Sequence, residues 1–210
     1  MLSKNGEISI SVIKRIPRYY RFLEILMNEG VTKISSNELA ARMSTTASQI
    51  RQDLNCFGCF GMQGYGYNIK QLHSEIGKIL NVNKISKMVL IGAGNLGHAI
   101  ASHMDFKSRG FSLIGIFDKD PDLIGKEING MTITSMDELD AFCKKNTPKS
   151  AIICVPYSAA PEIVKILIEN KVKGFWNFSH YNIMKDYPNT VVENVHLSDS
   201  LMTLSYQMKK

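Results

Sequence analysis

Hydrophobic side chains in the first part of the chain recur at helical spacing. Tyr20, Leu23 and Met27 form one apolar stripe in the segment "IPRYYRFLEILMNEG". Pro17 suits the first turn of this helix, and Gly30 can close it. The pattern therefore predicts a helix that begins near Pro17 and ends before Gly30.

Two capping signals mark further helices. Ser35 is placed to cap the segment "SSNEL", and Glu38 is placed to reach back to it, which is the spacing of a capping box. Thr46 and Gln49 repeat that spacing in "STTASQIRQDLNCFG", which Gly58 ends. The buried stripe of this third helix would be Ile50, Leu54 and Phe57. Its outward positions are then polar: Ser48, Gln49, Arg51, Gln52 and Asn55.

A short helix, a tight turn and a second helix with a polar outer face form the helix-turn-helix arrangement, whose second helix enters the major groove of DNA. The segment "GCFGMQGYGY" that follows predicts a hairpin wing, with Tyr65 and Tyr67 along the sugar-phosphate edge. Arg51 is the strongest candidate for a base or phosphate contact, because a guanidinium can form two parallel hydrogen bonds. The alternative is a winged helix that binds protein.

The hydrophobic pattern then changes to apolar runs that alternate with helical segments. "KMVLIGAGNLGHAIASHM" is an apolar strand, a G-x-G-x-x-G turn at Gly92, Gly94 and Gly97, and a helix. The next strand, "FSLIGIFDKD", ends at Asp118, 21 residues beyond Gly97. A carboxylate there can bind both adenosine ribose hydroxyls and would repel a 2′-phosphate. The pattern predicts a Rossmann domain that favours NAD(H) over NADP(H).

Strands and helices continue to alternate in "MTIT", "SAIICVP", "VKGFWNF" and "TVVENVHL", which predicts a parallel α/β sheet. Ligands bind beyond the carboxyl ends of such strands. The residues expected to flank the nicotinamide half, with strand-end packing as their alternative role, are Val155, Pro156, Tyr157, Asn177 and Phe178. The last segment, "LSDSLMTLSYQMKK", predicts an amphipathic helix that docks on a partner subunit through Leu201, Leu204 and Met208.

Composition and charge fit two small domains. The chain has 210 residues; residues 1–85 hold 11 Lys/Arg against 6 Asp/Glu, and residues 86–210 hold 14 against 13. Nearly all of the positive excess therefore lies in the predicted DNA-binding part, although a solvated basic face would give the same count. No apolar run approaches the roughly 20 residues of a membrane span, and no signal-peptide core is present, so a cytoplasmic protein without membrane association is expected.

The candidate catalytic and metal patterns are weak. Cys56 and Cys59 have C-x-x-C spacing, but no second ligand pair lies near them, so we expect no metal site and favour packing over thiol redox chemistry. Tyr181 and Lys185 have the Y-x-x-x-K spacing of short-chain dehydrogenases, but position 168 is Ile where a serine is needed. The sheet also uses nearly all residues after Asp118, which leaves no substrate domain. We therefore expect no enzyme, with a small NAD-dependent dehydrogenase as the alternative.

Seven segments together carry a resemblance that covers almost the whole chain: "IPRYYRFLEIL", "ISSNELA", "QIRQDLNCFGCFGMQGYGYNI", "VLIGAGNLG", "GIFDKDPDLIGKEINGMTI", "VKGFWNF" and "VVENVHLSDSLMTLSY". They resemble the Rex family of redox-sensing transcriptional repressors. The resemblance implies a homodimer that exchanges C-terminal helices, binds a palindromic operator in double-stranded DNA with NAD⁺ or no ligand, and leaves the DNA when NADH accumulates. It also implies a winged-helix domain at 1–84, a Rossmann domain at 85–196 and a dimerisation helix at 197–210.

The resemblance assigns roles to individual residues. Cofactor contacts are expected at Gly92, Ala93, Gly94, Asn95, Leu96, Gly97, Asp118, Val155, Pro156, Asn177 and Phe178. DNA contacts are expected at Arg18, Ser35, Ser36, Thr46, Ser48, Gln49, Arg51, Gln52, Gln63, Tyr65 and Tyr67.

The chain also departs from the family pattern. Gln52 and Gln63 stand where relatives commonly carry Lys or Arg, so fewer phosphate contacts and weaker DNA binding are expected. His196 stands where relatives carry an Asp that pairs with an N-terminal arginine, matching Arg15, to switch conformations. An imidazole cannot replace that ion pair. A divergent paralogue with altered DNA binding or ligand response is therefore the alternative.

Overall fold

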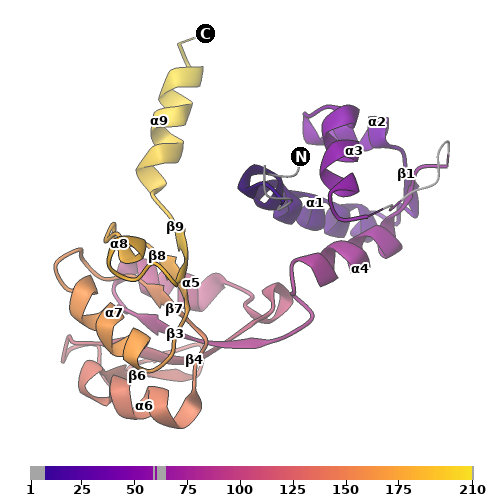
Figure 1. Cartoon of the computed structure of the whole chain (residues 1–210). Helices are drawn as coiled ribbons and strands as arrows, with labels where there is room; N and C mark the ends of the chain where they lie inside the picture. The colour runs from indigo at the N-terminus through magenta and orange to yellow at the C-terminus, as the bar shows by residue number, and fades with distance from the viewer. Residues whose placement is uncertain (1–7, 59, 61–64, 210) are drawn as a thin grey trace. The chain divides into compact units, whose positions relative to one another are not determined.

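The computed structural model of the chain describes residues 8–58, 60 and 65–209 (Figure 1). The chain divides into two compact units, Met1–Asn83 and Lys84–Lys210. None of the helices in the described ranges combines the length and the apolar character that crossing a bilayer requires.

The first unit is helical with a small two-stranded sheet. Its elements are α1 (Ile10–Asn28), β1 (Lys33–Ile34), α2 (Ser36–Met43), α3 (Ala47–Asn55), β2 (Tyr67–Asn68) and α4 (Ile69–Ile79). One apolar core joins all four helices, and its fully buried side chains include Ile16, Leu23, Ile50, Leu72 and Ile76. This burial is the main source of the unit's stability, because helices this short are marginal by themselves.

Helix α1 begins seven residues earlier than its sequence pattern predicts, at Ile10, so that Pro17 lies inside it. Val12 and Ile16 are buried in the core, and this packing extends the helix through a residue that lacks a backbone N–H. Pro17 itself is exposed. The predicted start at Pro17 is therefore wrong, because tertiary packing outweighs the local preference.

Most of the predicted hairpin wing lies outside the described residues, which resume at Tyr65. Strand β2 pairs antiparallel with β1, with Lys33 opposite Asn68 and Ile34 opposite Tyr67. Gly66 turns the chain into β2 with a φ of +70°, and a Cβ there would lie 2.6 Å from the Ile34 carbonyl oxygen. The sheet therefore joins the segment before α2 to the segment after the wing. Gln63 and Cys59 lie outside the described residues.

The second unit is a doubly wound sheet. Its described strands run in the order β5 (Glu127–Ile128), β6 (Met131–Ser135), β4 (Phe111–Asp118), β3 (Ser86–Ile91), β7 (Ser150–Ile153), β8 (Gly174–Asn177) and β9 (Val191–Asn194). All pairs are parallel except β5 with β6. Because β3 lies between β4 and β7, the strand order reverses beside it, which is where this class of sheet binds ligands.

Helices cover both faces of the sheet (Figure 1). On one face α6 (Leu139–Asn146) and α7 (Ala160–Glu169) pack on Val89, Ile91 and Ile153. On the other face α5 (Asn95–His103) packs over Leu90 and Ile116. Two helices follow near the end of the chain, α8 (Ile183–Asp186) and α9 (Leu197–Gln207), and no residue of α9 is buried. The prediction of an α/β Rossmann-type fold behind a winged helix-turn-helix is confirmed.

Candidate functional site

The turn between β3 and α5 requires glycine at two positions and leaves a third open. Gly92 has a φ of +94°, and a Cβ there would lie 2.5 Å from the Cys154 carbonyl oxygen. A Cβ on Gly97 would lie 1.8 Å from the Gly92 carbonyl oxygen. A Cβ on Gly94 would have no neighbour within 4 Å. Gly92 and Gly97 therefore serve the fold, whereas Gly94 leaves open space beside the backbone, as a pyrophosphate requires.

Two further features favour an anionic ligand at this turn. No side chain caps the amino end of α5, so the positive end of its dipole stays open at Gly94. Asn95 and Leu96 in its first turn are exposed. Asp118 at the end of β4 accepts hydrogen bonds from the Ala93 N–H at 2.5 Å and from the Asp120 N–H at 2.9 Å. Both bonds hold the carboxylate beside the glycine turn.

A cavity of about 170 Å³ lies at the carboxyl ends of β3, β4 and β7. Five of the predicted cofactor residues line it: Gly92, Gly94, Asp118, Val155 and Pro156. Residues that the sequence argument did not name complete the lining: Lys119, Met136, Cys154, Ala159 and Ile163. Part of the signal was available, because Lys119 directly follows the predicted strand end at Asp118 and Cys154 lies near the end of the predicted strand "SAIICVP". Since ligand sites are usually roughly 300–1,000 Å³, this cavity has room for only part of a ligand the size of a dinucleotide.

Asn177 and Phe178 have packing roles. Asn177 is fully buried, and its amide N–H₂ donates to the Tyr181 carbonyl at 2.9 Å and to Asn194 Oδ1 at 2.8 Å. Its Oδ1 accepts from the Ser179 N–H at 3.1 Å and hydroxyl at 2.6 Å. Phe178 packs edge-on against Trp176. The predicted ligand contact is wrong for the Asn177 side chain, because protein partners use all of its polar atoms.

The candidate dehydrogenase pair does not have the chemistry of a catalytic tyrosine. Tyr181 is buried, and its hydroxyl donates to Asp186 Oδ2 at 2.5 Å. Burial, followed by that bond, raises the pKa of Tyr181 to about 12. Proton transfer near neutral pH needs the opposite shift. Within the described residues, no group of three or more His, Cys, Asp or Glu side chains could hold a metal ion.

The outer face of α3 carries three of the predicted DNA contacts. Ser48, Arg51 and Gln52 are exposed there. Arg51 Nη1 donates to Ser36 Oγ of α2 at 2.8 Å, so these two side chains lie together at the surface. Arg51 retains further N–H groups for an anion, because a guanidinium carries five donors.

Three other predicted contacts, Ser35, Thr46 and Arg18, form hydrogen bonds at helix ends, and their contact with DNA stays a prediction. Ser35 Oγ accepts from the Glu38 N–H, and Glu38 bonds back to the Ser35 N–H, which completes the predicted capping box. Thr46 Oγ1 accepts from the Gln49 N–H at 3.1 Å and caps α3. Arg18 Nη2 donates to the Met43 carbonyl at the end of α2 at 2.5 Å. These polar groups thus satisfy helix ends, which need partners.

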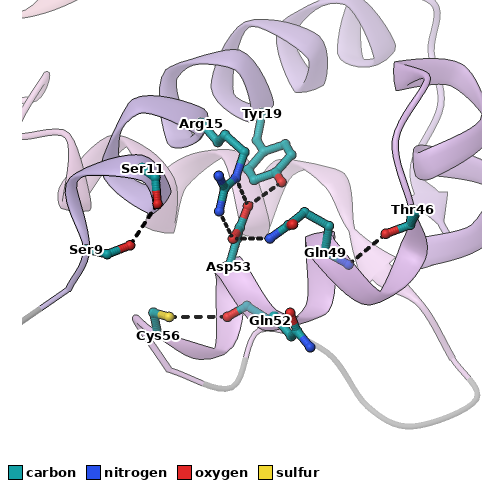
Figure 2. A network of polar contacts seen from close by, with 9 residues as sticks. All are labelled: Ser9, Ser11, Arg15, Tyr19, Thr46, Gln49, Gln52, Asp53 and Cys56. Atoms are coloured by element: carbon teal, nitrogen blue, oxygen red, sulfur yellow. Dashed lines mark hydrogen bonds and ion pairs between the residues drawn. The ribbon is translucent and has the colours of Figure 1, made fainter. Parts of the chain in front are cut away.

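Asp53 forms a polar cluster between α1 and α3 (Figure 2). Its fully buried carboxylate accepts from Arg15 Nε and Nη2 at 2.6 and 2.7 Å, from the Tyr19 hydroxyl at 2.6 Å and from Gln49 Nε2 at 2.8 Å. Gln49 therefore turns inward and donates its amide N–H₂ to Asp53, so its amide oxygen does not complete a capping box with the Thr46 N–H. We name Arg15, Tyr19, Gln49 and Asp53 the Asp53 cluster.

Opposing effects set the ionisation of the Asp53 cluster. Burial acts to raise the pKa of Asp53, but hydrogen bonds from Arg15, Tyr19 and Gln49 outweigh it and lower the pKa overall. The bond to Asp53 raises the pKa of Arg15. Burial and the bond to Asp53 raise the pKa of Tyr19. The cluster is therefore an ion pair that fixes α3 on α1. Sequence reasoning missed it, although Arg15 and Tyr19 stand one helical turn apart.

The two tyrosines of the wing have different environments. The Tyr65 side chain is 75% exposed, whereas Tyr67 is 8% exposed and belongs to the core of the first unit. The prediction of a DNA contact is therefore wrong for the Tyr67 ring, because its pairing with Ile34 turns it inward. Tyr65 remains at the surface.

The two predicted switch residues each have a partner within their own unit. Arg15 bonds to Asp53 in the first unit. His196 Nδ1 lies 2.6 Å from His180 Nδ1 in the second unit.

Comparisons with known proteins agree over the whole chain. Residues 7–55 match a family described as "Putative DNA-binding protein N-terminus", and residues 83–181 match "CoA binding domain". A redox-sensing transcriptional repressor Rex from Clostridium acetobutylicum is 48% identical over 97% of this chain and 95% of its own length. A Rex repressor from Caldicellulosiruptor saccharolyticus is 47% identical over 99% of this chain and 94% of its own length.

Solved structures agree as well. The crystal structure of RSP in complex with NAD⁺ and operator DNA is similar with a TM-score of 0.87 and 43% identity, over 96% of this chain and 92% of that one. RSP in complex with NADH is similar with a TM-score of 0.86 and 41% identity, over 96% and 94% of the two chains. These relatives are repressors and not enzymes. At this identity and coverage, the chain belongs to the Rex family of redox-sensing transcriptional repressors.

Proposed function

We propose that this chain binds operator DNA through α3 and the wing and leaves it when NADH replaces NAD⁺ in the Rossmann unit. The observation that carries the proposal is the glycine turn, where the fold occupies the space at Gly92 and Gly97 but leaves Gly94 open. The RSP repressor, 43% identical, has been crystallised with NAD⁺ and operator DNA, which supports the same ligands here.

Each unit contributes a distinct part of this function. Gly94 and the amino end of α5 would hold the pyrophosphate, and Asp118 would bind the adenosine ribose. Ala93, Asn95 and Leu96 would contribute backbone around the phosphates. Val155 and Pro156 would border the cofactor beyond β7. When bound, NADH or NAD⁺ supplies binding energy rather than chemistry, because a repressor needs no hydride transfer.

The DNA side of the proposal rests on exposed polar groups of the first unit. Arg51 is the expected base or phosphate contact, and Ser36, Ser48 and Gln52 would border it. Gln63 and Tyr65 would approach the backbone from the wing. The Asp53 cluster and the caps at Ser35 and Thr46 would preorganise α3, so that little conformational entropy is lost on binding.

The assembly is a homodimer in this proposal. No residue of α9 is buried, and Leu197, Leu201, Leu204 and Met208 are each more than half exposed. A second copy of the chain would cover them, and two copies would match the two halves of a palindromic operator. We expect the protein in the cytoplasm, because a repressor of this kind works where DNA is.

Release requires NADH to bind the DNA-incompetent arrangement better than the competent one, because a ligand with equal affinity for both shifts nothing. The test is fluorescence anisotropy with the operator duplex that RSP binds, at fixed salt. We expect specific binding with NAD⁺ and at least tenfold weaker binding with NADH. An Arg51→Gln variant should lose binding in both states. DNA binding that NADH leaves unchanged would refute the sensor function.

A further inference from the structure

Tyr157 is an exposed aromatic residue beside the nucleotide cavity. It directly follows Pro156 and stands two residues before Ala159, and both of these neighbours line the cavity. The Ala159 N–H donates to the Pro156 carbonyl at 3.0 Å, so Tyr157 lies within a closed turn that leads into α7. Tyr157 is nevertheless 61% exposed. A large aromatic ring is thus left uncovered next to the candidate cofactor site.

A buried neighbour supports this ring from one side. The rings of Tyr157 and Tyr181 meet edge to face, with centroids 6.1 Å apart and planes 80° apart. Tyr181 is itself 8% exposed, and its hydroxyl is bonded to Asp186. Edge-to-face contacts between aromatic rings are favourable. The Tyr157 ring therefore rests on a fixed partner, while most of its surface stays open.

The position of Tyr157 in the sheet is that of the nicotinamide half of a dinucleotide. The two halves of such a cofactor lie on opposite sides of the switch point, beyond the carboxyl ends of the strands. Asp118 ends β4 on one side of β3, whereas Tyr157 follows β7 on the other side. Since Asp118 is the expected contact of the adenosine ribose, the nicotinamide half extends toward Tyr157.

The two forms of the cofactor differ in charge at the nicotinamide ring. This ring is a pyridinium cation in NAD⁺ and an uncharged dihydropyridine in NADH. The face of an aromatic ring carries partial negative charge and attracts a cation that lies over it. A neutral ring gains no such attraction. An aromatic side chain beside the nicotinamide therefore stabilises the oxidised form more than the reduced one.

We propose that Tyr157 favours NAD⁺ over NADH by placing its aromatic face against the cationic nicotinamide ring. This inference rests on the proposed function and names the side chain that sets the ratio of the two affinities. NADH competes with NAD⁺ for one site, so tighter binding of NAD⁺ raises the NADH:NAD⁺ ratio at which the operator is released. Tyr157 is thus a specificity-determining residue of the sensor.

The affinities are tested by calorimetric titration of the full-length protein with NAD⁺ and with NADH, each in the absence of DNA. We expect Tyr157→Leu to weaken NAD⁺ binding about three- to tenfold and to change NADH binding less than about twofold. Tyr157→Phe is the matched control, because it keeps the ring and removes the hydroxyl, and it should keep the wild-type ratio of affinities. Urea unfolding shows that each variant is folded.

A spectroscopic signature tests the contact directly. In Tyr157→Trp an electron-rich indole would stack on the electron-poor pyridinium of NAD⁺. We expect this complex to absorb at longer wavelengths than the protein or NAD⁺ alone, through charge transfer between the two rings. NADH should give no such band. The wild type is the control, because its single tryptophan is Trp176 of β8.

Three results would overturn the proposal. The first is a wild-type ratio of NAD⁺ to NADH affinity in Tyr157→Leu. The second is an equal fall of that ratio in Tyr157→Phe and Tyr157→Leu, because the hydroxyl and not the ring face would then discriminate. The third is a Tyr157→Leu variant that keeps both affinities but forms a weaker dimer in sedimentation, since the ring would then belong to a subunit interface.

The proposed function can fail separately. If NADH left operator binding unchanged, the sensor function would be refuted, but the titrations without DNA would still decide the role of Tyr157. If the sensor function holds, Tyr157→Leu should release the operator at a NADH:NAD⁺ ratio that is about three- to tenfold lower than in the wild type.

Discussion

At the scale of single residues, Gly94 is a position where a substitution should weaken ligand binding without weakening the fold. Its φ of −61° is open to any residue, and an added Cβ would meet no protein atom within 4 Å. We therefore expect Gly94→Ala to leave the free energy of unfolding within about 1 kcal/mol of the wild type. The methyl group would occupy the space that a pyrophosphate needs, so NADH affinity should fall at least tenfold. Urea unfolding and calorimetric titration measure the two effects.

The matched control is Gly97→Ala. Its Cβ would lie 1.8 Å from the Gly92 carbonyl oxygen, so this variant should lose stability as well as NADH affinity. If Gly94→Ala binds NADH like the wild type, the pyrophosphate does not lie at this turn.

Asp53 makes the stability of the first unit depend on pH. Although burial opposes it, hydrogen bonding to Arg15, Tyr19 and Gln49 lowers the pKa of Asp53 below its ordinary value. Because the pKa of Asp53 is lower in the folded than in the unfolded protein, its carboxylate stabilises the fold at any pH above the unfolded-state pKa. This stabilisation is lost as the pH falls through the folded-state pKa. We expect the urea midpoint to drop as pH falls below about 4.

Asp53→Asn should remove this component of the pH dependence and destabilise the protein by about 2 kcal/mol at pH 7, since Arg15 loses its negatively charged partner and one of the two acceptor oxygens becomes an N–H₂ donor. Glu29→Gln is the control. Glu29 pairs with Arg42 at 2.7 Å, but both side chains are 48% exposed, and such surface pairs contribute little. If Asp53→Asn and Glu29→Gln lowered the free energy of unfolding equally, the role assigned to the Asp53 cluster would be contradicted.

At the scale of elements, the sequence predicted correctly those features that depend on residues close together in the chain. The capping box at Ser35 and the glycine turn at Gly92 follow from residues a few positions apart, and both formed as predicted. The start of α1 depends on burial, and the partner of β2 depends on pairs 33 and 35 residues apart in the chain. Gln49 turns inward toward Asp53, whose position depends on Tyr19 and Arg15, 34 and 38 residues away. Sequence periodicity does not report such contacts, because it reflects each segment alone.

The outer face of α3 allows a test of the DNA-binding element by charge. Gln52 is exposed beside Arg51 and carries no charge. In Gln52→Lys the new cation should neutralise one more phosphate, tighten operator binding and steepen the dependence of log K on log salt by about 0.9. Thr132→Lys adds the same charge at an exposed position of β6 and should leave the slope unchanged. If the wild type, Gln52→Lys and Thr132→Lys showed the same dependence of log K on log salt, Gln52 would lie away from the DNA backbone.

At the scale of the whole molecule, two units with separate cores must be coupled through their assembly. The first unit closes its core with α1 to α4, and the second closes its core around the sheet. Neither needs the other's residues to bury its apolar side chains. NADH then affects DNA binding by changing the relative stability of a DNA-competent and a DNA-incompetent arrangement of the units. DNA and NADH both contribute to that equilibrium.

Such coupling is reciprocal, which gives a prediction independent of any structural detail. If NADH weakens operator binding by a given factor, saturating operator must weaken NADH binding by the same factor. Typical couplings are about 5- to 150-fold, so both changes are measurable. We expect the NADH dissociation constant, followed by the fluorescence of the bound cofactor, to rise with added operator but not with a scrambled duplex. The two factors should agree at one pH and salt concentration. If operator left NADH affinity unchanged while NADH released DNA, the release would come from competition by another species rather than from a shift between arrangements.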